Sequence, residues 1–417
     1  MLNPKTNERE LAYVVTVGWV RPIEGADNIE LIGINGWTCI AKKGEFLEGD
    51  LAIYFEIDSK LPVADWSAFM ESKHYKVKTM KLSKFKVISQ GLALPADAFG
   101  WELTTTGQFA GDVPIIKTND AKDTYFMDGD FLTERLGVTY SVAEDNARKA
   151  PSADKYKKMA QRNPKIFQKP FVKWLYKRMW GKKLLFVFFG KKKDKMGWPA
   201  WVVKTDEERV ENLPWVLGDK SIKWFATEKV DGSSSTFTMR GFGRKREFYV
   251  CSRNVCFNTP MKIENNCYYD TNIYIEMSEK YHMQDVLASI LDEHKNELDF
   301  VTIQGETYGE GVQKKTYDLK GHDLAIFNVI LGYKNGEVVR LNPREMKNLM
   351  DSYNLPTVPI LNEAYVLPDT IDELRAYVNS EPSKIDGKIK EGIVFRSRDG
   401  KRSFKCVSPE FLLKFHQ

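Results

Sequence analysis

The sequence predicts an α+β protein in which an all-β region comes first and a mixed region of strands and helices follows. Near the N-terminus, short runs rich in β-branched and aromatic residues recur about every ten residues and are separated by glycine-containing turns. After residue 204, similar runs alternate with longer segments of helical periodicity. The chain has 417 residues, which is enough for two or three domains.

The composition is that of an ordinary globular protein. Hydrophobic residues make up 42% and charged residues 29%, which excludes a disordered or fibrous chain. The apolar run at residues 184–189 (LLFVFF) is far shorter than the ~20 residues of a membrane span, and the first ten residues lack the apolar core of a signal peptide. Five cysteines, an odd number, indicate free thiols in a reducing compartment. We therefore expect an intracellular, cytoplasmic protein.

Positive charge is concentrated in one segment. Residues 148–195 hold 17 Lys or Arg and 2 Asp, a net charge of +15, whereas the whole chain carries +5 and the remainder therefore −10. Such an asymmetry favours a polyanionic partner, either nucleic acid or an anionic membrane. Within it, residues 171–180 (FVKWLYKRMW) predict a cationic amphipathic helix. We favour domain packing and nucleic acid over a membrane, because nothing else in the sequence indicates lipid contact.

Residues 1–140 predict a small β-barrel of the OB type. One strand each is expected at residues 11–20, 51–62 and 87–95, and two at residues 29–41 around the glycines at 33 and 36, with turns between them. A five-stranded OB barrel fits this spacing, and such barrels bind nucleic acid through basic and aromatic faces. The lysine-rich stretch 73–86, in which Tyr75 and Phe85 alternate with lysines, is either such a face or a solvated surface.

Residues 141–203 read as a basic connector and residues 204–417 as the mixed domain. Thr205, with Glu208 three residues later, predicts the start of a short helix. The acidic pair Asp206 and Glu207 is interpreted as part of that helix start rather than as a metal site. Residues 243–246 (GRKR) predict a hairpin turn, and residues 272–299 a helical stretch.

The segment at residues 227–233 (TEKVDGS) is the main candidate for chemistry. Lys229 ends an apolar strand and precedes a glycine turn, an arrangement that presents an amine to a ligand. To act as a nucleophile this amine must lose its proton, which burial, a neighbouring cation or a metal promotes. The four-residue pattern K-x-D-G alone is weak, since it also describes a strand that ends in a turn.

Further candidates follow at the ends of later strands, and their conjunction carries the argument. Arg253 suits a phosphate or a ribose hydroxyl, and Phe327 either stacks on a base or packs in the core. Glu306 and Glu391 provide carboxylates for a divalent cation, and Lys405 adds a cation near the C-terminus. A nucleophile, two carboxylates and phosphate-binding cations are the equipment for nucleotidyl transfer.

In these motifs the chain resembles the covalent nucleotidyltransferases, which comprise polynucleotide ligases and RNA capping enzymes. K-x-D-G, S-R, G-E, E-G-I-V and a terminal lysine occur in the family's order over residues 205–417. The resemblance is closest to ATP-dependent RNA ligases with an OB domain ahead of the transferase domain, the Deinococcus-type group, through the segments VRPIEGADNIELIGINGW, SQGLALP and KTDEERVEN. It implies an OB barrel followed by an ATP-grasp-like nucleotidyltransferase domain.

The resemblance also implies a reaction. Lys229 would attack the α-phosphorus of ATP to form lysyl-AMP, the AMP would pass to a 5′-phosphate on RNA, and a 3′-hydroxyl would then seal the strand, in RNA repair. The implied substrates are RNA ends, RNA–DNA hybrids or nicked duplexes, without protein partners that can be named. The implied metal, Mg²⁺ or Mn²⁺, would be held by Glu391, Asp231 and Glu306. The implied nucleotide-binding residues are Glu228, Asp231, Gly232, Arg253, Glu306, Phe327 and Lys405.

One departure and two alternatives accompany this interpretation. Related RNA ligases often have K-x-K in the last motif, whereas this chain has Ser403 at the first position, after Lys401 and Arg402; Arg402 is a candidate replacement. The alternatives are a DNA-nick ligase or a GTP-using capping-type enzyme, and a catalytically dead OB-type binding protein. Only 12 residues follow Lys405, which leaves no room for the C-terminal OB domain usual in DNA ligases and capping enzymes.

Overall fold

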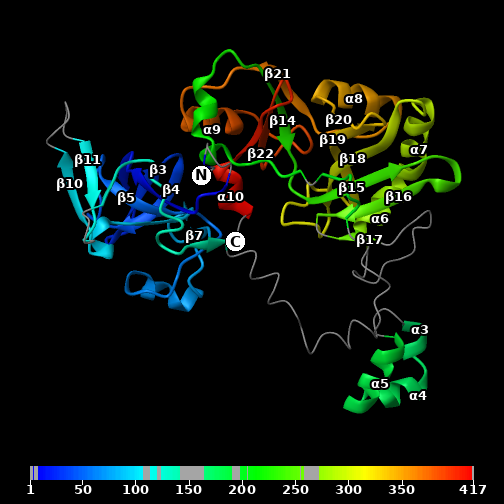
Figure 1. Ribbon diagram of the computed structural model, residues 1–417, viewed down its shortest axis with the longest axis horizontal. Coiled ribbons are helices and arrows are strands. Elements are labelled where there is room, and N and C mark those ends of the chain that lie inside the picture. The colour runs from blue at the N-terminus through cyan, green and yellow to red at the C-terminus, as the bar shows by residue number, and fades with distance from the viewer. Residues whose placement is uncertain are drawn as a thin grey trace.

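The structure is a computed structural model that describes residues 3, 8–106, 113–119, 124–140, 164–189, 198–203, 205–253, 255–257 and 272–415. The predicted α+β class is confirmed: an N-terminal domain of strands precedes a domain of mixed strands and helices (Figure 1). Of the predicted connector, 141–203, residues 141–163 and 190–197 lie outside the described residues. The domain boundaries 1–140, 141–203 and 204–417 stay a prediction.

The N-terminal domain is built from small antiparallel sheets. β1 (Ala12–Thr16), β5 (Leu51–Phe55) and β9 (Leu92–Leu94) form one, and β2 (Trp19–Pro22), β3 (Ile29–Ile34) and β4 (Trp37–Lys42) form another. β1 and β5 are buried on both faces, because one face packs in each of two hydrophobic clusters. The remaining strands are β6 (Ser59–Lys60), β7 (Met80–Leu82), β8 (Val87–Ser89), β10 (Glu102–Thr106), β11 (Val113–Lys117), β12 (Tyr125–Phe126) and β13 (Thr139–Tyr140).

The described part of the basic connector contains three short helices. These are α3 (Pro164–Phe167), α4 (Pro170–Tyr176) and α5 (Met179–Phe189). The single helix predicted for residues 171–180 is therefore wrong in extent, because the helix breaks at Lys177 and Arg178 so that α5 packs back on α4 around Leu175 and Leu185. Within the ranges that the structure describes, no helix is long and apolar enough to span a bilayer.

The mixed domain contains two antiparallel sheets in its described residues, each with its own hydrophobic core. The larger sheet has the order β17 (Cys256–Phe257), β16 (Glu247–Ser252), β15 (Ser233–Arg240), β18 (Leu298–Gly309), β19 (His322–Tyr333) and β20 (Val338–Arg340). The smaller sheet has the order β21 (Ile360–Tyr365), β14 (Trp224–Lys229), β22 (Gly392–Ser397) and β23 (Ser403–Val407).

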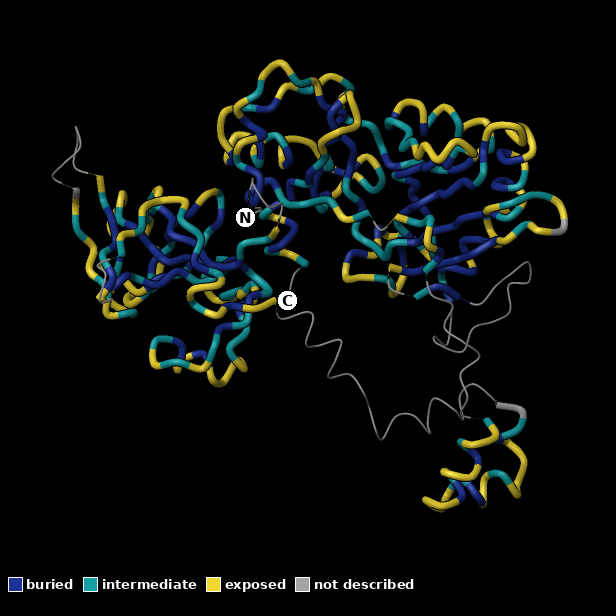
Figure 2. The backbone as a smooth tube through the Cα atoms, viewed as in Figure 1, coloured by how far each residue is buried: buried dark blue, intermediate teal, exposed yellow. Residues whose placement is uncertain are grey.

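Helices cover both sheets. α6 (Ile273–Lys280), α7 (Met283–Glu293) and α8 (Pro343–Ser352) pack on the larger sheet, and α9 (Ile371–Ser380) packs on the smaller one. α10 (Pro409–Phe415) contacts β8 of the N-terminal domain. The central strands are dark blue in Figure 2, and the helices expose their outer faces. The helical prediction for residues 272–299 is confirmed as far as Glu293, and the hairpin turn at residues 243–246 is confirmed between β15 and β16.

The short helix predicted at Thr205 is wrong, and so is the reading of Asp206 and Glu207 as its start. Residues 205–208 have no regular secondary structure, and a 3₁₀ turn, η3, begins only at Val210. The reason is a tertiary contact: Lys405 on β23 donates its backbone N–H to the Glu208 carbonyl at 2.7 Å. This strand-like pairing uses the backbone that the local capping signal would have made helical.

Candidate active site

The chain crosses from one sheet of the mixed domain to the other at the K-x-D-G segment. Lys229 is the last residue of β14 in the smaller sheet, and Ser233 is the first residue of β15 in the larger one (Figure 1). Val230, between them, is buried in the core of the larger sheet. The crossing therefore places the lysine at the junction of the two sheets, where side chains from both meet.

Gly232 is required by this crossing. A Cβ on Gly232 would lie 2.3 Å from the carbonyl oxygen of Thr307 and 2.9 Å from Cγ of Glu306. Contacts that close are not tolerated, so only a residue without a side chain lets the crossing approach β18. Next to it, the backbone N–H of Asp231 donates to the hydroxyl of Tyr317 at 2.7 Å. The turn is thus held against β18 and against the segment around residue 317.

Lys229 is hydrogen-bonded to the carboxylate of Glu391, which is far away in the sequence. Its Nζ donates to Oε2 of Glu391 at 2.6 Å. The contact follows from strand register, because Lys229 pairs with Gly392, the first residue of β22 and the neighbour of Glu391. Glu306 comes from β18, where it lies opposite Ser234. The two sheets therefore each bring one of the predicted carboxylates to the lysine.

Burial is the largest influence on the pKa values of Lys229, Asp231 and Glu306. Burial alone would lower the pKa of Lys229, but Glu391, Glu306 and Asp231 outweigh it and raise that pKa above its usual value. Burial raises the pKa of Glu306 to about 8, with Lys229 opposing and the other carboxylates adding to the shift. Burial, reinforced by Glu391, raises the pKa of Asp231 to about 6. Three carboxyl groups, those of Asp231, Glu306 and Glu391, therefore surround one ammonium group, and in their fully ionised form they would carry more negative charge than Lys229 neutralises.

The carboxylates suit a divalent cation that keeps most of its water. Glu391, Asp231 and Glu306 offer hard oxygen ligands, as Mg²⁺ and Mn²⁺ prefer. Burial and the neighbouring carboxylates raise the pKa values of Asp231 and Glu306. Across the described residues, no group of three or more His, Cys, Asp or Glu side chains forms a ready metal cage. Mg²⁺ usually takes one or two carboxylates together with water and substrate phosphates.

Two predicted phosphate-binding cations meet on one carboxylate. Lys405 on β23 places its Nζ 3.0 Å from Oδ1 of Asp206, and the Arg253 guanidinium, just beyond β16, binds Oδ2 of the same residue. Burial alone would raise the pKa of Asp206, but Lys405 and Arg253 outweigh it and hold that pKa below its usual value. Asp206 therefore joins cations that come from the two different sheets.

Ser403, where related ligases often have a lysine, is not a free phosphate contact. Its hydroxyl donates to Glu207, whose carboxylate also binds Arg340 at 2.8 Å and lies 3.8 Å from Arg396. Arg402, the candidate replacement, is half-exposed and lies 3.9 Å from Asp219. The guanidinium groups that share a carboxylate with Ser403 are thus Arg340 and Arg396, not Arg402.

Glu228 is positioned by hydrogen bonds to a neighbouring loop, and Phe327 by an irregularity in strand pairing. The Glu228 carboxylate is buried and accepts hydrogen bonds from the Ser383 hydroxyl and from the Lys384 backbone N–H, so it anchors that loop beside β14. Phe327 lies in a register shift: Gln304 pairs with Asn328 but Gly305 pairs with Ile326. Such a bulge leaves one residue unpaired and redirects its side chain. Their predicted contacts with the adenine stay predictions.

Several residues of the site were not predicted from the sequence. Lys315 is buried, with its Nζ 2.8 Å from the Ile389 carbonyl and 3.2 Å from Asp386. Tyr317 receives the Asp231 N–H, and Arg340 binds Glu207. None of these lies in a recognisable motif. Asp206 and Glu207 carried a signal, since they belong to the KTDEERVEN segment of the resemblance.

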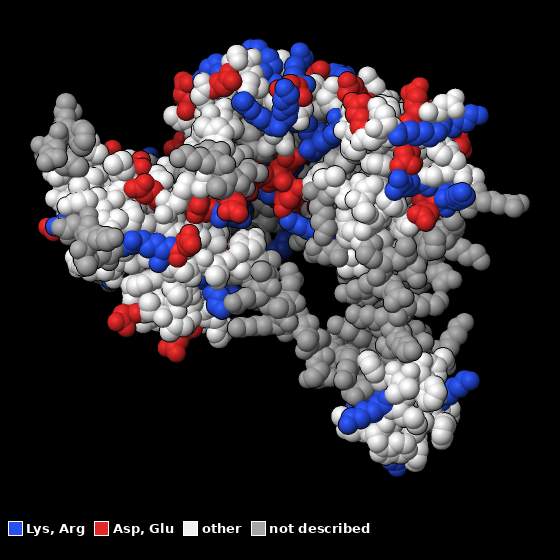
Figure 3. Space-filling model, in the orientation of Figure 1, with Lys and Arg blue, Asp and Glu red and all other residues white. Residues whose placement is uncertain are grey.

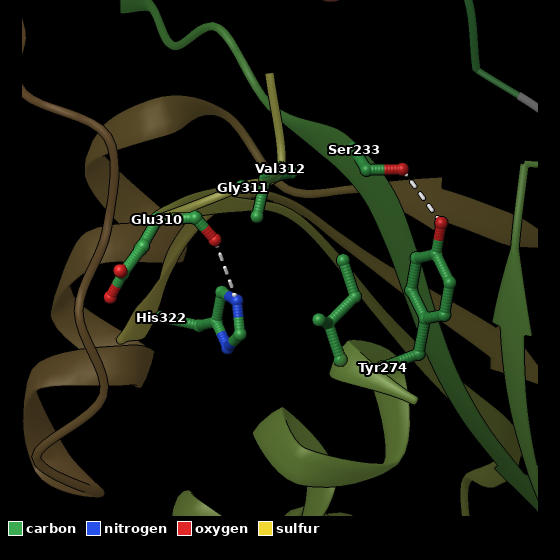
Figure 4. Close-up of a pocket in the computed structure, with 7 residues that line it drawn as sticks. Ser233, Tyr274, Glu310, Gly311, Val312 and His322 are labelled. Atoms are coloured by element: carbon green, nitrogen blue, oxygen red, sulfur yellow. Dashed lines mark hydrogen bonds between the residues drawn. The ribbon is translucent and has the colours of Figure 1, made fainter. Parts of the chain in front are cut away.

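A separate cavity of about 460 Å³ lies on the opposite face of the larger sheet. Ser233 faces it, whereas the next residue, Ser234, pairs with Glu306 on the Lys229 side. Two hydrogen bonds are drawn in Figure 4. One joins the hydroxyls of Ser233 and Tyr274, which are 2.7 Å apart. The other joins an imidazole nitrogen of His322 to the Glu310 carbonyl, 3.0 Å away. His322, which also contacts Glu276 at 2.9 Å, is therefore a hydrogen-bonded histidine on the other face of the sheet.

The cysteine predictions are also tested. Cys39, Cys251, Cys256 and Cys406 are buried thiols that form no disulfide, as expected, while Cys267 lies outside the described residues. Cys251 and Cys256 face each other across β16 and β17 without forming a disulfide. Among the described residues they belong to no group of three or more His, Cys, Asp or Glu side chains that could hold a metal ion.

Comparisons with known proteins agree with this arrangement. Residues 11–96 match the family model of an OB-fold domain, and residues 222–414 match that of RNA ligase. A solved structure of Naegleria gruberi RNA ligase with PPi is 27% identical, with a TM-score of 0.60, over 98% of this chain and 99% of that one. A mutant of that ligase with ATP and Mn is 28% identical, with a TM-score of 0.61, over 98% of this chain and 100% of that one. A search of curated proteins found no match.

Proposed function

We propose, from the premise that an OB-fold domain here precedes an RNA ligase domain, that the chain is an ATP-dependent RNA ligase. It would seal breaks between a 3′-hydroxyl and a 5′-phosphate through a lysyl-AMP intermediate, in RNA repair. The order of the two domains supports placing it with the Deinococcus-type ligases. The free, buried state of the described cysteines supports action in a reducing compartment.

One observation carries the proposal: Lys229 lies at the junction of two sheets with Glu391 bonded to its amine and Glu306 beside it. The lysine offers a nucleophile and the carboxylates offer ligands for a divalent ion, while further cations nearby can bind phosphates. Together they make a suitable site for a nucleoside triphosphate. The similar Naegleria ligase has been solved with ATP and Mn and with AMP and Mn. We propose the same kind of ligands for this chain.

In the first step the Lys229 amine attacks the α-phosphorus of ATP. A P–N bond forms, the bond to the β-phosphate oxygen breaks, and pyrophosphate leaves. Before ATP binds, the three carboxylates hold the amine protonated, because they raise its pKa. A divalent ion held through water by Glu391, Asp231 and Glu306 would offset their charge and that of the phosphates. With that charge offset, the lysine loses its proton more readily.

The remaining residues hold the nucleotide. Lys405 and Arg253, which share Asp206 in the free chain, would turn to the α-phosphate and its neighbouring groups. Phe327, unpaired in its bulge, would stack on the adenine. In the second step AMP passes from Lys229 to the 5′-phosphate of RNA. In the third, a 3′-hydroxyl attacks that phosphate, the phosphodiester bond forms, and AMP leaves.

The first prediction concerns the nucleophile. Wild-type protein incubated with α-labelled ATP and Mg²⁺ should acquire acid-resistant AMP label. Lys229→Ala should lose it completely, because the change removes the amine that is hydrogen-bonded to Glu391 at the junction of the two sheets. Lys223→Ala, a change of an exposed lysine one residue before β14, is the matched control and should keep the label. Label that persists in Lys229→Ala would remove the nucleophile assignment.

Substrate choice is tested with the same protein. ATP should label it and GTP should not, and sealing should require RNA at the break when matched RNA and DNA nicks are compared. Preference for GTP, or for an all-DNA nick, would replace this proposal with a capping-type enzyme or a DNA ligase. Failure of every nucleotide to label the wild-type chain would leave an OB-type binding protein.

A further inference from the structure

Residues 164–189, which comprise α3, α4 and α5 and are called the helical unit below, have a distinctive charge. They contain seven Lys or Arg and no Asp or Glu. Figure 3 accordingly shows blue and white but no red on the described atoms of this unit. Such a surface repels cations and attracts polyanions over distances of about a Debye length, roughly 8–10 Å.

The helical unit also exposes aromatic side chains. Its small core contains Phe167, Leu175 and Leu185. Outside that core, Phe171 is 69% exposed and Trp174 is 47% exposed, and Trp180 is 55% exposed. Large aromatic residues left this open on a soluble surface indicate a binding site.

One cation lies directly over an exposed aromatic ring of the unit. The guanidinium carbon of Arg178 lies 3.8 Å from the ring centre of Trp174, and Nζ of Lys182 lies 5.2 Å from that of Tyr176. Phe171 and Trp174 are nearly parallel, at an interplanar angle of 16° and a centroid distance of 6.0 Å. Arg178 thus covers an exposed ring, whereas the ring of Tyr176 packs against the small core of the unit.

We propose that the helical unit is a binding surface for single-stranded RNA, an inference that rests on the proposed ligase function. Unpaired bases stack on aromatic rings while their phosphates bind neighbouring cations, and this combination is typical of sequence-tolerant binding to single strands. A helix that binds a bilayer instead separates its charged face from its apolar face. Here Arg178 lies over the exposed ring of Trp174, so a cation and an aromatic face share one place on the unit, which favours RNA.

The test uses the full-length chain without ATP and a short fluorescent single-stranded RNA, with binding followed by anisotropy over a range of salt. Trp174→Ala should weaken binding by about tenfold, the size of one lost stacking contact, while Trp174→Phe, which keeps an aromatic ring, should bind nearly as wild type. Lys173→Gln with Lys177→Gln should lower the slope of log affinity against log salt by about 1.4, or ~0.7 for each lost phosphate contact.

The matched control is Lys245→Gln with Lys295→Gln, two exposed lysines of the ligase domain, which should leave the salt slope unchanged. Circular dichroism checks that each variant keeps its helices. Unchanged RNA affinity in both Trp174→Ala and the Lys173→Gln, Lys177→Gln double variant would overturn the proposal. So would loss of binding to phosphatidylserine vesicles without loss of RNA binding, which would assign the surface to a membrane.

Failure of this inference is separable from failure of the ligase function. Every variant is also incubated with labelled ATP, and the formation of lysyl-AMP needs no RNA. Label retained together with unchanged RNA affinity refutes the helical-unit surface alone. Absence of label in the wild-type chain refutes the ligase function, whatever the RNA affinity.

Discussion

Three carboxyl groups, those of Asp231, Glu306 and Glu391, lie near the amine of Lys229. Whether each carboxyl group carries a proton sets the net charge of the site. Glu306 carries the largest of these carboxylate shifts, a pKa of about 8 caused by burial. A group with a raised carboxyl pKa binds its proton more tightly in the folded chain than in the unfolded one. Its contribution to stability is therefore present below its ordinary pKa of about 4.3 and is lost as the pH rises towards 8.

The second prediction follows for metal dependence. Below pH 8 a proton competes with the divalent ion for Glu306, so the Mg²⁺ concentration that gives half-maximal lysyl-AMP should rise by up to about tenfold for each pH unit between 8 and 6. It is measured by titrating Mg²⁺ at fixed ATP and several pH values. Labelling should also be fastest in mildly alkaline solution, where Lys229 loses its proton more readily. A metal requirement that is constant over this range would contradict the role of Glu306.

The third prediction concerns Asp206, which ties Arg253 and Lys405 together in the free chain. Asp206→Asn removes the charge that competes with the phosphates of ATP. Because the pair is partly exposed, the ATP concentration for half-maximal labelling should fall by only about two- to fivefold, as for a surface ion pair. Asp219→Asn, at the exposed partner of Arg402, should have no effect. Weaker ATP binding in Asp206→Asn would mean that Asp206 itself helps to hold the nucleotide.

At the level of the elements, function depends on how β14 passes into β15. β14 brings Lys229 from the smaller sheet, and β15 begins the larger sheet only after the crossing at residues 230–232. Glu391 and Glu306 reach the lysine through the registers of β22 with β14 and of β15 with β18. A shift of this crossing would move the lysine relative to both carboxylates.

The fourth prediction tests that geometry. Gly232→Ala places a Cβ 2.3 Å from the Thr307 carbonyl oxygen, so the crossing must move away from β18. A displacement of about 1 Å at a reacting group costs roughly a hundredfold in rate, and the rate of lysyl-AMP formation should fall by about that factor. Gly218→Ala is the control, because its Cβ would meet nothing within 4 Å. Equal labelling rates in the two variants would show that the close approach is not needed.

At the level of the whole molecule, the N-terminal domain of strands is docked on the smaller sheet of the mixed domain. Arg209 lies over the ring of Trp37 at 5.6 Å, and the β3–β4 turn at Gly36 contacts Ile371 at the start of α9. Beside this contact Arg375 binds Glu211 at 2.8 Å, with both side chains largely buried. This ion pair joins α9 to η3 (Val210–Asn212) next to the domain interface.

The fifth prediction is that Arg375→Leu destabilises the chain. It leaves the Glu211 carboxylate buried without its cation, which should lower the free energy of unfolding by about 3 kcal/mol. Denaturant titration of full-length protein measures this loss. Lys347→Gln breaks an exposed pair with Asp351 and should cost at most about 0.5 kcal/mol. Equal losses in the two variants would show that the buried pair contributes no more than a surface one.

The sequence by itself determined the order of an OB barrel and a mixed α+β domain, and it indicated most of the residues that meet at the site. These features are readable because strand periodicity, turn residues and short motifs are local properties of the chain. It also indicated free thiols, which the described cysteines confirm. Where local signals competed with distant contacts, it misled, as at Thr205 and at residues 171–180.

Only the tertiary structure decided how those residues are combined. Lys229 and Glu391 are 162 positions apart and meet at 2.6 Å because β14 and β22 pair in one register. Asp206 joins Arg253 and Lys405 rather than starting a helix, because β23 pairs with the backbone at residues 208 and 209. Lys315 and Tyr317 brace the turn without any motif. Such contacts depend on the free energy of packing distant segments together, which no local pattern records.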